Sequence, residues 1–377
     1  MLNQKAKEHL ESQQYRVVGS HSAVKVCHWT KNMLKGDGGC YKLTFYGIMS
    51  HQCMQATPSI SCANRCVFCW RGYKAPVSKE WKWDVDDPKM IVDKSIEAHH
   101  KLLTGYGGHE RVNPGMYEQS KSAKHVALSL TGEPITYPKI NEMLRIYNEK
   151  GISTFMVTNA QYVEQIRNLA PVTQLYLSID APTKELLKEI DNPLFEDYWE
   201  RFIGSIDAVR EKKQRTTARL TVIKGLNDVM PEKYAEWLKL GNFDFVEIKG
   251  YVFVGASRQR LSIDNMPMHE EVVAFARDVE KHLPGYEMMS EHIASRVVLL
   301  AKKERFYKNG AWHTWIDFDK WHKLMTTLPP EKQKEVTVED YMTRTKARTG
   351  ISGKGTADYI SPAQKKRMRK AHEEIEE

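Results

Sequence analysis

Six cysteines lie between residues 27 and 69 of this 377-residue chain, and their spacing divides them into two groups. Cys62, Cys66 and Cys69 form a tight Cys-x3-Cys-x2-Cys loop, whereas Cys27, Cys40 and Cys53 have twelve residues between successive members. In a reducing compartment, clustered cysteines are more often metal ligands or catalytic groups than disulfides. Two groups of three thiols therefore predict two metal centres, each lacking one protein ligand.

The tight loop is suited to an iron-sulfur cluster. Three thiolates within eight residues can hold three irons of a cubane, because thiolate is the usual ligand of such clusters. The fourth iron is then open to a chelating molecule such as S-adenosylmethionine, whose sulfonium a reduced cluster can split to give a 5′-deoxyadenosyl radical. A structural zinc site normally needs four protein ligands, and the loop contains no histidine. We favour the cluster over zinc and over inert buried thiols.

The upstream trio is less specific by spacing alone. Cys27, Cys40 and Cys53 are compatible with reduced structural thiols. They are also compatible with a Cys3His structural zinc site completed by His28 or His51. These alternatives stay open on the residues themselves.

The elements that must position these thiols are short strands alternating with amphipathic helices. This alternation predicts six βα units and a parallel sheet with helices outside, either open or as an incomplete barrel. Strands are expected at 52–60, 125–130, 152–158, 174–179, 218–223 and 245–249. Helices are expected at 138–150, 162–169, 198–213, 231–240 and 269–282.

Polar motifs follow several of these strands, where the active sites of α/β folds collect. The tight cysteine loop follows the first strand, and Gly132-Glu133-Pro134 follows the second. Asn159 follows the third, and Ser178 and Asp180 end the fourth. Each motif also has an ordinary interpretation as a βα turn or a cap.

Composition restricts the class of protein further. With 41% hydrophobic residues the chain can bury a substantial core, and no apolar run approaches the ~18 residues of a membrane span. The amino terminus is polar and lacks the apolar core of a signal peptide, so we expect a cytoplasmic protein. Residues 341–370 carry nine Lys or Arg and one acid, which predicts a mobile basic tail, either simply solvated or in contact with phosphates.

The chain resembles the radical S-adenosylmethionine superfamily, with its partial barrel, through the tight loop on the first βα unit. More narrowly it resembles the tRNA 4-demethylwyosine synthase family. That likeness rests on four features: the cysteine loop running into Trp70-Arg71-Gly72, the upstream trio, the segment 129–134 and the segment 251–261. The resemblance covers residues 20 to 300 and implies the stand-alone archaeal form. It also implies four regions, namely an extension (1–50), the partial (β/α)6 barrel (51–300), a second extension packed on the barrel (301–340) and the tail (341–377).

The resemblance also implies residue roles. Cys62, Cys66 and Cys69 would hold the 4Fe-4S cluster that binds S-adenosylmethionine, and Cys27, Cys40 and Cys53 would hold a second 4Fe-4S cluster that pyruvate approaches. Lys42 matches a lysine proposed to form a Schiff base with pyruvate. Gly132 and Glu133 would receive the methionine ammonium, and Asn159 and Ser178 would contact the ribose or methionine part of the same cofactor.

The implied reaction begins when the adenosyl radical takes hydrogen from the N1-methyl group of N1-methylguanosine beside the anticodon of phenylalanine tRNA. Addition to pyruvate, loss of a carboxyl carbon and ring closure would build the tricyclic base. An external one-electron donor and a monomeric enzyme are expected. The base must leave its stack, and we expect Trp70, Trp81 and Trp83 to stack on it. The basic residues expected to grip phosphates are Arg71, Lys74, Lys79, Lys82, Arg258 and Arg260.

Two rival hypotheses remain. Another radical S-adenosylmethionine enzyme that modifies RNA or activates a partner would share the tight loop without needing pyruvate. A non-catalytic, zinc-stabilised RNA-binding protein would explain the cysteines and the basic tail, but not six βα units with polar strand ends. The tryptophans and their basic neighbours are equally compatible with an amphipathic surface or the edge of a core.

Overall fold

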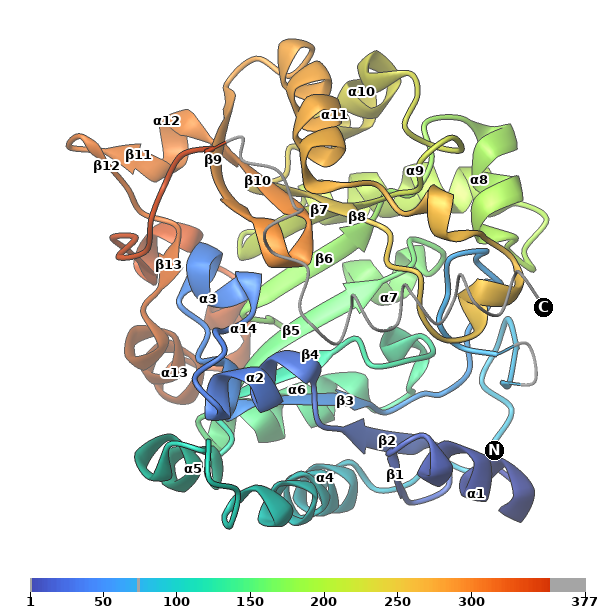
Figure 1. Cartoon of the computed structure of the whole chain (residues 1–377), viewed down its shortest axis with the longest axis vertical. Helices are drawn as coiled ribbons and strands as arrows, with labels where there is room; N and C mark the ends of the chain where they lie inside the picture. Colours follow the sequence, from blue (N-terminus) through green and yellow to red (C-terminus); the bar gives the residue numbers. More distant parts are fainter. Residues whose placement is uncertain (1, 73–74, 353–377) are drawn as a thin grey trace.

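Six parallel strands form the centre of the computed structural model, which describes residues 2–72 and 75–352 (Figure 1). Each strand pairs with the next one along the chain, as six consecutive βα units require. The predicted α/β fold with a partial (β/α)6 barrel is therefore confirmed. The strands are β3 (Cys53–Thr57), β4 (His125–Leu128), β5 (Ser153–Thr158), β6 (Gln174–Ser178), β7 (Arg215–Val222) and β8 (Phe245–Gly250).

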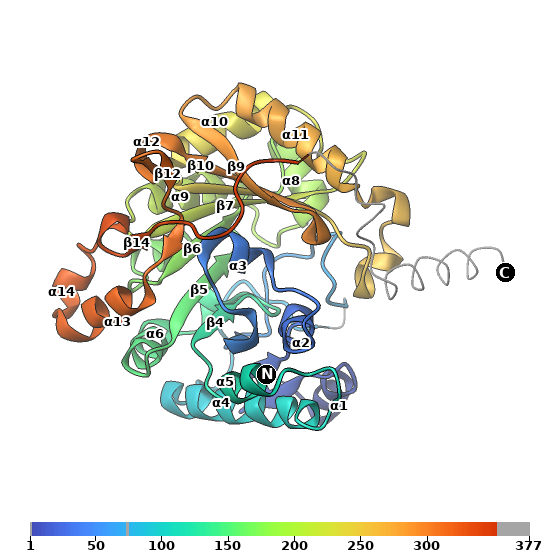
Figure 2. The ribbon, with the colours of Figure 1, turned by 60° about the vertical axis from the view of Figure 1, so that its left-hand side comes forward.

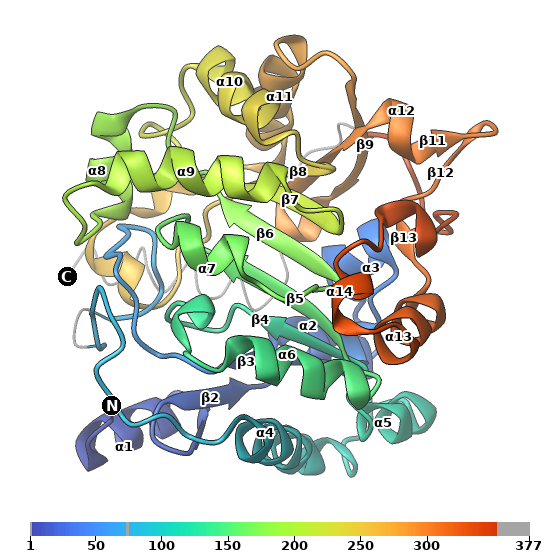
Figure 3. The same ribbon diagram turned by 180° about the vertical axis from the view of Figure 1, so that it is seen from behind.

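Helices cover the outer face of this sheet (Figure 3). Alternate residues of each strand, such as Ala218, Leu220 and Val222 of β7, are buried in the main apolar core beneath them. The intervening residues point into the barrel. The outer helices are α4 (Pro88–Leu103), α6 (Ile140–Glu149), α7 (Val163–Arg167), α8 (Lys184–Asp191), α9 (Tyr198–Arg210), α10 (Pro231–Gly241) and α11 (His269–Lys281).

Antiparallel strands extend the sheet at both edges, which the sequence prediction missed. At one edge β1 (Arg16–Val18) pairs with β2 (Ser22–Lys25), which pairs with β3. At the other, β10 (Val297–Lys302) lies between β8 and β9 (Tyr286–His292). A search for βα units does not find these strands, because each of them pairs antiparallel with its neighbours, whereas a βα unit joins parallel strands. The sheet therefore has ten strands among the described residues.

Two short helices lie on the inner face of the barrel, in front of the strands in Figure 1. They are α2 (His28–Leu34) and α3 (Tyr41–Tyr46). Three residues of α3, Tyr41, Phe45 and Tyr46, belong to a second apolar core with inward residues of β5, β6 and β8. Helices α1 (Gln4–Ser12) and α5 (Pro114–Ser120) lie outside the barrel.

The carboxyl-terminal region packs against one side of the barrel (Figure 2). Trp321, fully buried, donates a hydrogen bond from Nε1 to Asn148 Oδ1 of α6 (3.3 Å). The elements are α12 (Lys303–Phe306), β11 (Tyr307–Lys308), β12 (Ala311–Trp312), β13 (Trp315–Ile316), α13 (Phe318–Thr327), α14 (Pro330–Gln333) and β14 (Met342–Thr343). No helix in the described ranges is long and apolar enough to cross a membrane.

The prediction of a mobile tail from residue 341 is wrong for its first part. Tyr341 is fully buried, and its hydroxyl donates to Thr173 O (3.1 Å). Further on, Gly350 N donates to Met289 O of β9 (2.7 Å), and Ser352 N and Oγ both donate to Glu291 Oε1 (2.6 Å each). One buried aromatic ring and a few backbone bonds thus fix residues 341–352. The rest of the predicted tail, 353–377, lies outside the described residues.

Candidate active site

The tight cysteine loop leaves β3 at the carboxyl edge of the sheet and is held there by backbone hydrogen bonds. Arg65 N donates to Asp191 O (2.9 Å) and Val67 N to Ile190 O (2.8 Å), both at the end of α8. Within the loop, Cys69 N donates to Cys66 O (3.1 Å). The loop's path is therefore set by the neighbouring βα unit as well as by its own turn.

Two arginines bind carbonyl oxygens of this loop. Arg71 Nη2 donates to Asn64 O within the loop (3.5 Å), and Arg71 Nη1 donates to Ile60 O (2.8 Å) and Pro76 O (3.2 Å) on either side of it. Arg260 Nε donates to Val67 O (2.9 Å), and Arg260 Nη2 donates to Cys69 O. We expected both guanidinium groups to contact tRNA phosphates, but here their donors are directed to the loop backbone. Spacing could not reveal this, because the Arg260 contacts join residues more than 190 positions apart.

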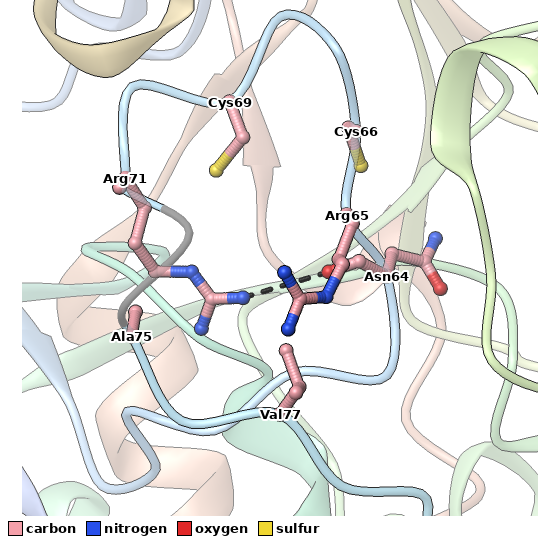
Figure 4. A pocket seen from close by; sticks show the side chains of 8 residues that line it. Asn64, Arg65, Cys66, Cys69, Arg71, Ala75 and Val77 are labelled. Atoms are coloured by element: carbon pink, nitrogen blue, oxygen red, sulfur yellow. Dashed lines mark hydrogen bonds between the residues drawn. The ribbon is translucent and has the colours of Figure 1, made fainter.

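The thiols of Cys66 and Cys69 border a pocket inside the loop. Figure 4 shows both sulfurs pointing toward its interior, with the guanidinium groups of Arg65 and Arg71 across from them. Burial raises the pKa of the Cys62 thiol to about 11, and the positive charge of Arg71 lowers it in opposition. Metal binding must therefore displace these protons, as it does wherever thiolates are the ligands.

Glu133 and Asn159 meet beside Cys62. Asn159 N donates to Glu133 Oε2 (2.9 Å), while Asn159 Nδ2 donates to Cys62 Sγ (3.5 Å). Glu133 is buried, its Oε1 has no hydrogen-bond partner among the described residues, and burial raises its pKa to about 8. A buried carboxylate oxygen without a partner is a suitable acceptor for a ligand's ammonium group.

Gly132 allows this approach of the second βα turn to the cysteine loop. Its φ is +71°, and a Cβ atom there would lie 2.0 Å from Ser59 O. No other residue fits at that distance. Because Glu133 N donates to Ser61 O (2.7 Å), the turn is joined directly to the residue before Cys62.

The two residues predicted at the end of β6 separate in the structure. Ser178 is half-buried and lies opposite Arg219 of β7 in the strand register. Asp180 is buried, and its Oδ1 accepts a hydrogen bond from Thr221 N (3.1 Å). Asp180 therefore has a clear structural role in holding β7. For Ser178 the structure shows a place at the mouth of the barrel and no contact with Glu133 or Asn159.

The upstream trio assembles from three elements. Cys27 and Cys40 are the N-cap residues of α2 and α3, and Cys53 is the first residue of β3. The three are close enough for their charges to interact, since the negative charge of Cys27 raises the pKa of Cys40 and of Cys53. Burial is the larger cause, and it raises these pKa values to about 11 and about 12.

Lys42 lies beside this trio. Its positive charge lowers the pKa of both Cys40 and Cys53 against the effect of burial. Its Nζ lies 5.6 Å from the centre of the Tyr176 ring, which is fully buried on the inner face of β6. Lys42 is thus a half-buried amine inside the barrel rather than a surface charge.

A buried carboxylate holds the helix that carries Cys40 and Lys42. Glu247 of β8 is fully buried and accepts hydrogen bonds from the hydroxyls of Tyr41 (3.0 Å) and Tyr46 (2.9 Å). Tyr41 lies between Cys40 and Lys42 in the sequence. We define this Tyr41–Tyr46–Glu247 contact as the α3 clamp.

The histidines considered as zinc ligands have other neighbours. His51 Nε2 lies 2.8 Å from Gln119 Oε1, and His28 Nε2 lies 3.1 Å from Asn32 Nδ2. Across residues 2–72 and 75–352, no group of three or more His, Cys, Asp or Glu side chains is arranged to hold a single metal ion. A cubane cluster does not need such a group, because each of its thiolate ligands binds a separate iron.

The tryptophans expected to stack on a base differ in their surroundings. Trp81 packs against His21 and Tyr137, and its Nε1 donates to Trp83 O (2.6 Å), as at the edge of a core. Trp70 stacks on Tyr15 with ring centres 5.9 Å apart.

The basic residues expected to contact phosphates also differ in their surroundings. Lys79 and Lys82 are exposed, and Lys74 lies outside the described residues. The guanidinium carbon of Arg258 lies 5.4 Å from the centre of the Phe253 ring.

Sequence analysis missed three charged residues on the inner wall, namely Arg219 of β7 and Glu247 and Lys249 of β8. Burial lowers the pKa of Lys249 to about 8. The sequence did contain a signal for them. Side chains alternate between the two faces of a strand, and the outer face is covered by helices, so charged residues at every second position must point to the inner face. The expected strands at 218–223 and 245–249 contain all three.

Comparison with known families agrees with this geometry. The model of the Radical SAM superfamily matches residues 57–238, which begin at the end of β3, run through five of the outer helices and end within α10. Six parallel strands with a Cys-x3-Cys-x2-Cys loop at their carboxyl edge thus define a radical S-adenosylmethionine protein. A second model, described as wyosine base formation, matches residues 240–302, including the turn that carries Arg260.

Relatives narrow the class. The S-adenosyl-L-methionine-dependent tRNA 4-demethylwyosine synthase of Xenopus laevis is 48% identical over 92% of this chain and 47% of the relative. A solved structure of TYW1 with a lysine-pyruvate adduct bound is 33% identical, with a TM-score of 0.73 over 81% of this chain and 98% of that one. A crystal structure of archaeal TYW1 is 30% identical, with a TM-score of 0.67 over the same shares. The chain belongs to the tRNA 4-demethylwyosine synthase family.

The chain spans about half the length of the curated relatives it matches. Membership of the superfamily implies one 4Fe-4S cluster and S-adenosylmethionine, and the residues at the tight loop fit both. The donor set is three free thiols, two of which border one pocket. Beside it, the buried Oε1 of Glu133 has no partner among the described residues and suits the cofactor's ammonium.

Proposed function

We propose that this chain condenses N1-methylguanosine of phenylalanine tRNA with pyruvate to form 4-demethylwyosine. The observation that carries the proposal is the presence of two three-cysteine sets along one strand. Cys53 begins β3 and the tight loop follows its end; at about 3.3 Å per residue the strand from Cys53 to Thr57 is about 13 Å long, so the two sets lie at opposite ends of it. Between the two sets lies the interior of the barrel, where two substrates can meet.

The tight loop would hold the cluster that cleaves S-adenosylmethionine, and when bound that cluster supplies the electron for the cleavage. Cys62, Cys66 and Cys69 provide its ligands. Glu133 accepts the methionine ammonium through the oxygen that has no partner among the described residues. Asn159 bridges Glu133 and Cys62, so it fixes the cofactor's amino end relative to the loop. Ser178, at the barrel mouth, is assigned to the ribose.

The upstream trio would hold a second 4Fe-4S cluster, with Lys42 as the amine that binds pyruvate. Its nitrogen attacks the keto carbon, water leaves, and an imine remains. The attack requires the amine in its neutral form, and the α3 clamp fixes the helix on which the amine lies. A relative whose solved structure holds a lysine-pyruvate adduct supports the assignment.

The tRNA would present its anticodon loop at the carboxyl edge of the strands. Exposed Lys79 and Lys82 lie in the segment between the tight loop and α4, where they can contact phosphates. The target base must unstack to enter the barrel, and single-stranded loops allow this at little cost. An external one-electron donor acting on a monomeric, cytoplasmic enzyme completes the proposal.

The test is a reconstituted reaction with tRNA that carries N1-methylguanosine, S-adenosylmethionine, dithionite and 13C-labelled pyruvate. Nucleoside mass analysis should show 4-demethylwyosine carrying pyruvate-derived carbon. Lys42→Arg is the matched variant, because it keeps the positive charge but cannot form the imine; it should still cleave S-adenosylmethionine and make no tricyclic base. Labelled product from Lys42→Arg would refute the role of Lys42.

The same reaction separates the rival activities. Cleavage of S-adenosylmethionine with no incorporation of pyruvate carbon by the unaltered protein would point to a different radical enzyme. About eight irons per chain are expected from two cubane clusters. Stoichiometric zinc without iron would contradict the proposal altogether.

A further inference from the structure

Arg219 presents a guanidinium group to the interior of the barrel. It lies on β7 between Ala218 and Leu220, which are buried in the outer core, so its own side chain faces inward. The residue is half-buried. In the strand register it lies opposite Ser178 on one side and Glu247 on the other.

The natural partner for this guanidinium is already occupied. Glu247 directly faces Arg219, yet the oxygens of its carboxylate accept the hydroxyls of Tyr41 and Tyr46 in the α3 clamp. Among residues 2–72 and 75–352, Arg219 forms no ion pair, and no side-chain hydrogen bond with it is observed. An arginine carries five N–H donors in a planar fork that matches a carboxylate, and such donors are seldom left without an acceptor.

Two further cations share this part of the interior. Lys249 of β8 lies on the same inner face, where burial and then the positive charge of Arg219 lower its pKa and the charge of Cys40 raises it. Among the described residues its Nζ makes one long hydrogen bond, to Ser295 O (3.4 Å). Burial raises the pKa of Tyr176, the ring over which the Lys42 amine lies, and the positive charge of Arg219 lowers it in opposition, so Arg219 is near this ring too. Arg219, Lys249 and Lys42 therefore share the inner face of the barrel, where the buried carboxylates near Arg219 are Glu247, held in the α3 clamp, and Asp180, whose Oδ1 accepts from Thr221 N.

We propose that Arg219 and Lys249 form a carboxylate-binding site on the inner wall of the barrel, opposite Lys42. Its ligand is a small α-keto acid whose carboxylate lies against the guanidinium while its keto carbon faces the Lys42 amine. This deepens the proposed function, on which it rests, by assigning selection of the keto acid to residues outside both cysteine sets. The carboxylate of S-adenosylmethionine could bind the same two cations, and the experiment distinguishes the two ligands.

The experiment uses the iron-reconstituted full chain and two ligands that differ only in charge. Pyruvate and its neutral amide, pyruvamide, are titrated separately, the imine is reduced with cyanoborohydride, and the mass gain on the Lys42 peptide is measured. In the unaltered protein, half-maximal trapping should need at least about tenfold more pyruvamide than pyruvate, since only the acid can form a bidentate pair. Equal concentrations for the two ligands would overturn the proposal without any variant.

Three variants extend the test. Arg219→Gln should raise the half-saturating pyruvate concentration about tenfold or more and leave that of pyruvamide unchanged; Arg219→Lys and Lys249→Met should show smaller shifts in the same direction. Arg167→Gln, on the outer face, is the control and should match the unaltered protein. The half-saturating concentration of S-adenosylmethionine is measured in parallel by its reductive cleavage.

The outcomes are distinct. A shift for pyruvate alone supports the keto acid as ligand, and a shift for S-adenosylmethionine alone assigns the same site to that cofactor's carboxylate. No shift for either ligand in protein that retains its iron overturns the site. If the unaltered protein forms no adduct on Lys42 at any pyruvate concentration, the proposed function has failed instead.

Discussion

The two cysteine sets are built in different ways. Cys62, Cys66 and Cys69 lie within one loop, whose backbone bonds to α8 and whose carbonyl oxygens accept hydrogen bonds from Arg71 and Arg260. Cys27, Cys40 and Cys53 come from two helix N-caps and the start of a strand. The first set is specified mainly by local sequence, and the second exists only when α2, α3 and β3 have folded against one another.

Each set nevertheless depends on one charged side chain from β8 or the turn after it. Arg260, just beyond the 3-10 turn Gly255–Gln259, binds the tight loop, and Glu247 holds α3 through the tyrosine hydroxyls. Both belong to the segment matched by the wyosine-specific model, not to the one shared with the superfamily. The family-specific segment therefore contacts both the loop shared with the superfamily and the helix that carries Cys40.

Loss of a single thiol should have the largest effect, and the effect should differ between the two cysteine sets. Cys66→Ala should abolish cleavage of S-adenosylmethionine, by more than about a thousandfold, because a thiolate ligand is lost. Cys40→Ala should instead retain that cleavage, lose about four of eight irons and make no tricyclic base. Iron analysis and release of 5′-deoxyadenosine measure the two effects. Formation of the base by Cys40→Ala would show that the upstream trio is structural.

Loss of the hydrogen bonds from Arg260 to Val67 O and Cys69 O should produce the next largest effect, confined to the tight loop. Arg260→Gln leaves two loop carbonyls without a charged donor, which costs about 1.5–3 kcal/mol for each hydrogen bond to a charged group. We expect cleavage of S-adenosylmethionine to fall about a hundredfold and iron to be lost faster to a chelator. Arg258→Gln, in the same turn, is the matched control and should stay near the unaltered rate. Similar losses in both variants would indicate that the whole turn had unfolded.

The α3 clamp should give a smaller effect, confined to the second site. Glu247→Gln keeps one carbonyl acceptor for Tyr41 or Tyr46 but weakens the other contact, at about 1–2 kcal/mol. Imine formation at Lys42 should therefore slow about tenfold, while cleavage of S-adenosylmethionine stays unchanged. Tyr46→Phe should reproduce part of the loss, since it removes one of the two bonds. A fall in both activities would contradict the separation of the two sites.

Local signals predicted the parts of this molecule that depend on local structure. The alternation of strands and helices gave β3 to β8, and the eight-residue cysteine loop identified the radical site. Gly132 and Glu133 were found because they follow a strand, and the structure brings Glu133 and Asn159 together beside Cys62. Each of these features is encoded within about ten residues.

The remainder depends on contacts between distant residues. Tyr41 and Glu247 are 206 positions apart, and Arg260 lies 193 positions from the carbonyl of Val67. The sequence shows that Trp81 and Arg71 can bind RNA, but not that a neighbouring core or loop already occupies them. The prediction that Tyr341 belongs to a mobile tail was wrong for the same reason, because its partners are Thr173, just before β6, and Arg215, the first residue of β7, both much earlier in the chain.

The smallest expected effect is a pH dependence of the first site. Burial raises the pKa of Glu133 to about 8, so below that pH its carboxyl is mostly protonated and cannot pair with an ammonium group. Binding of S-adenosylmethionine must then release a proton, and affinity should rise about threefold between pH 7.5 and 8.5 and level off above that range. Glu133→Gln, neutral throughout, should bind more weakly and lose this slope. Imine formation at Lys42, measured with pyruvate alone, should be the same in Glu133→Gln as in the unaltered protein. A change would show that the sites at the two ends of β3 are coupled, which would contradict their separate construction.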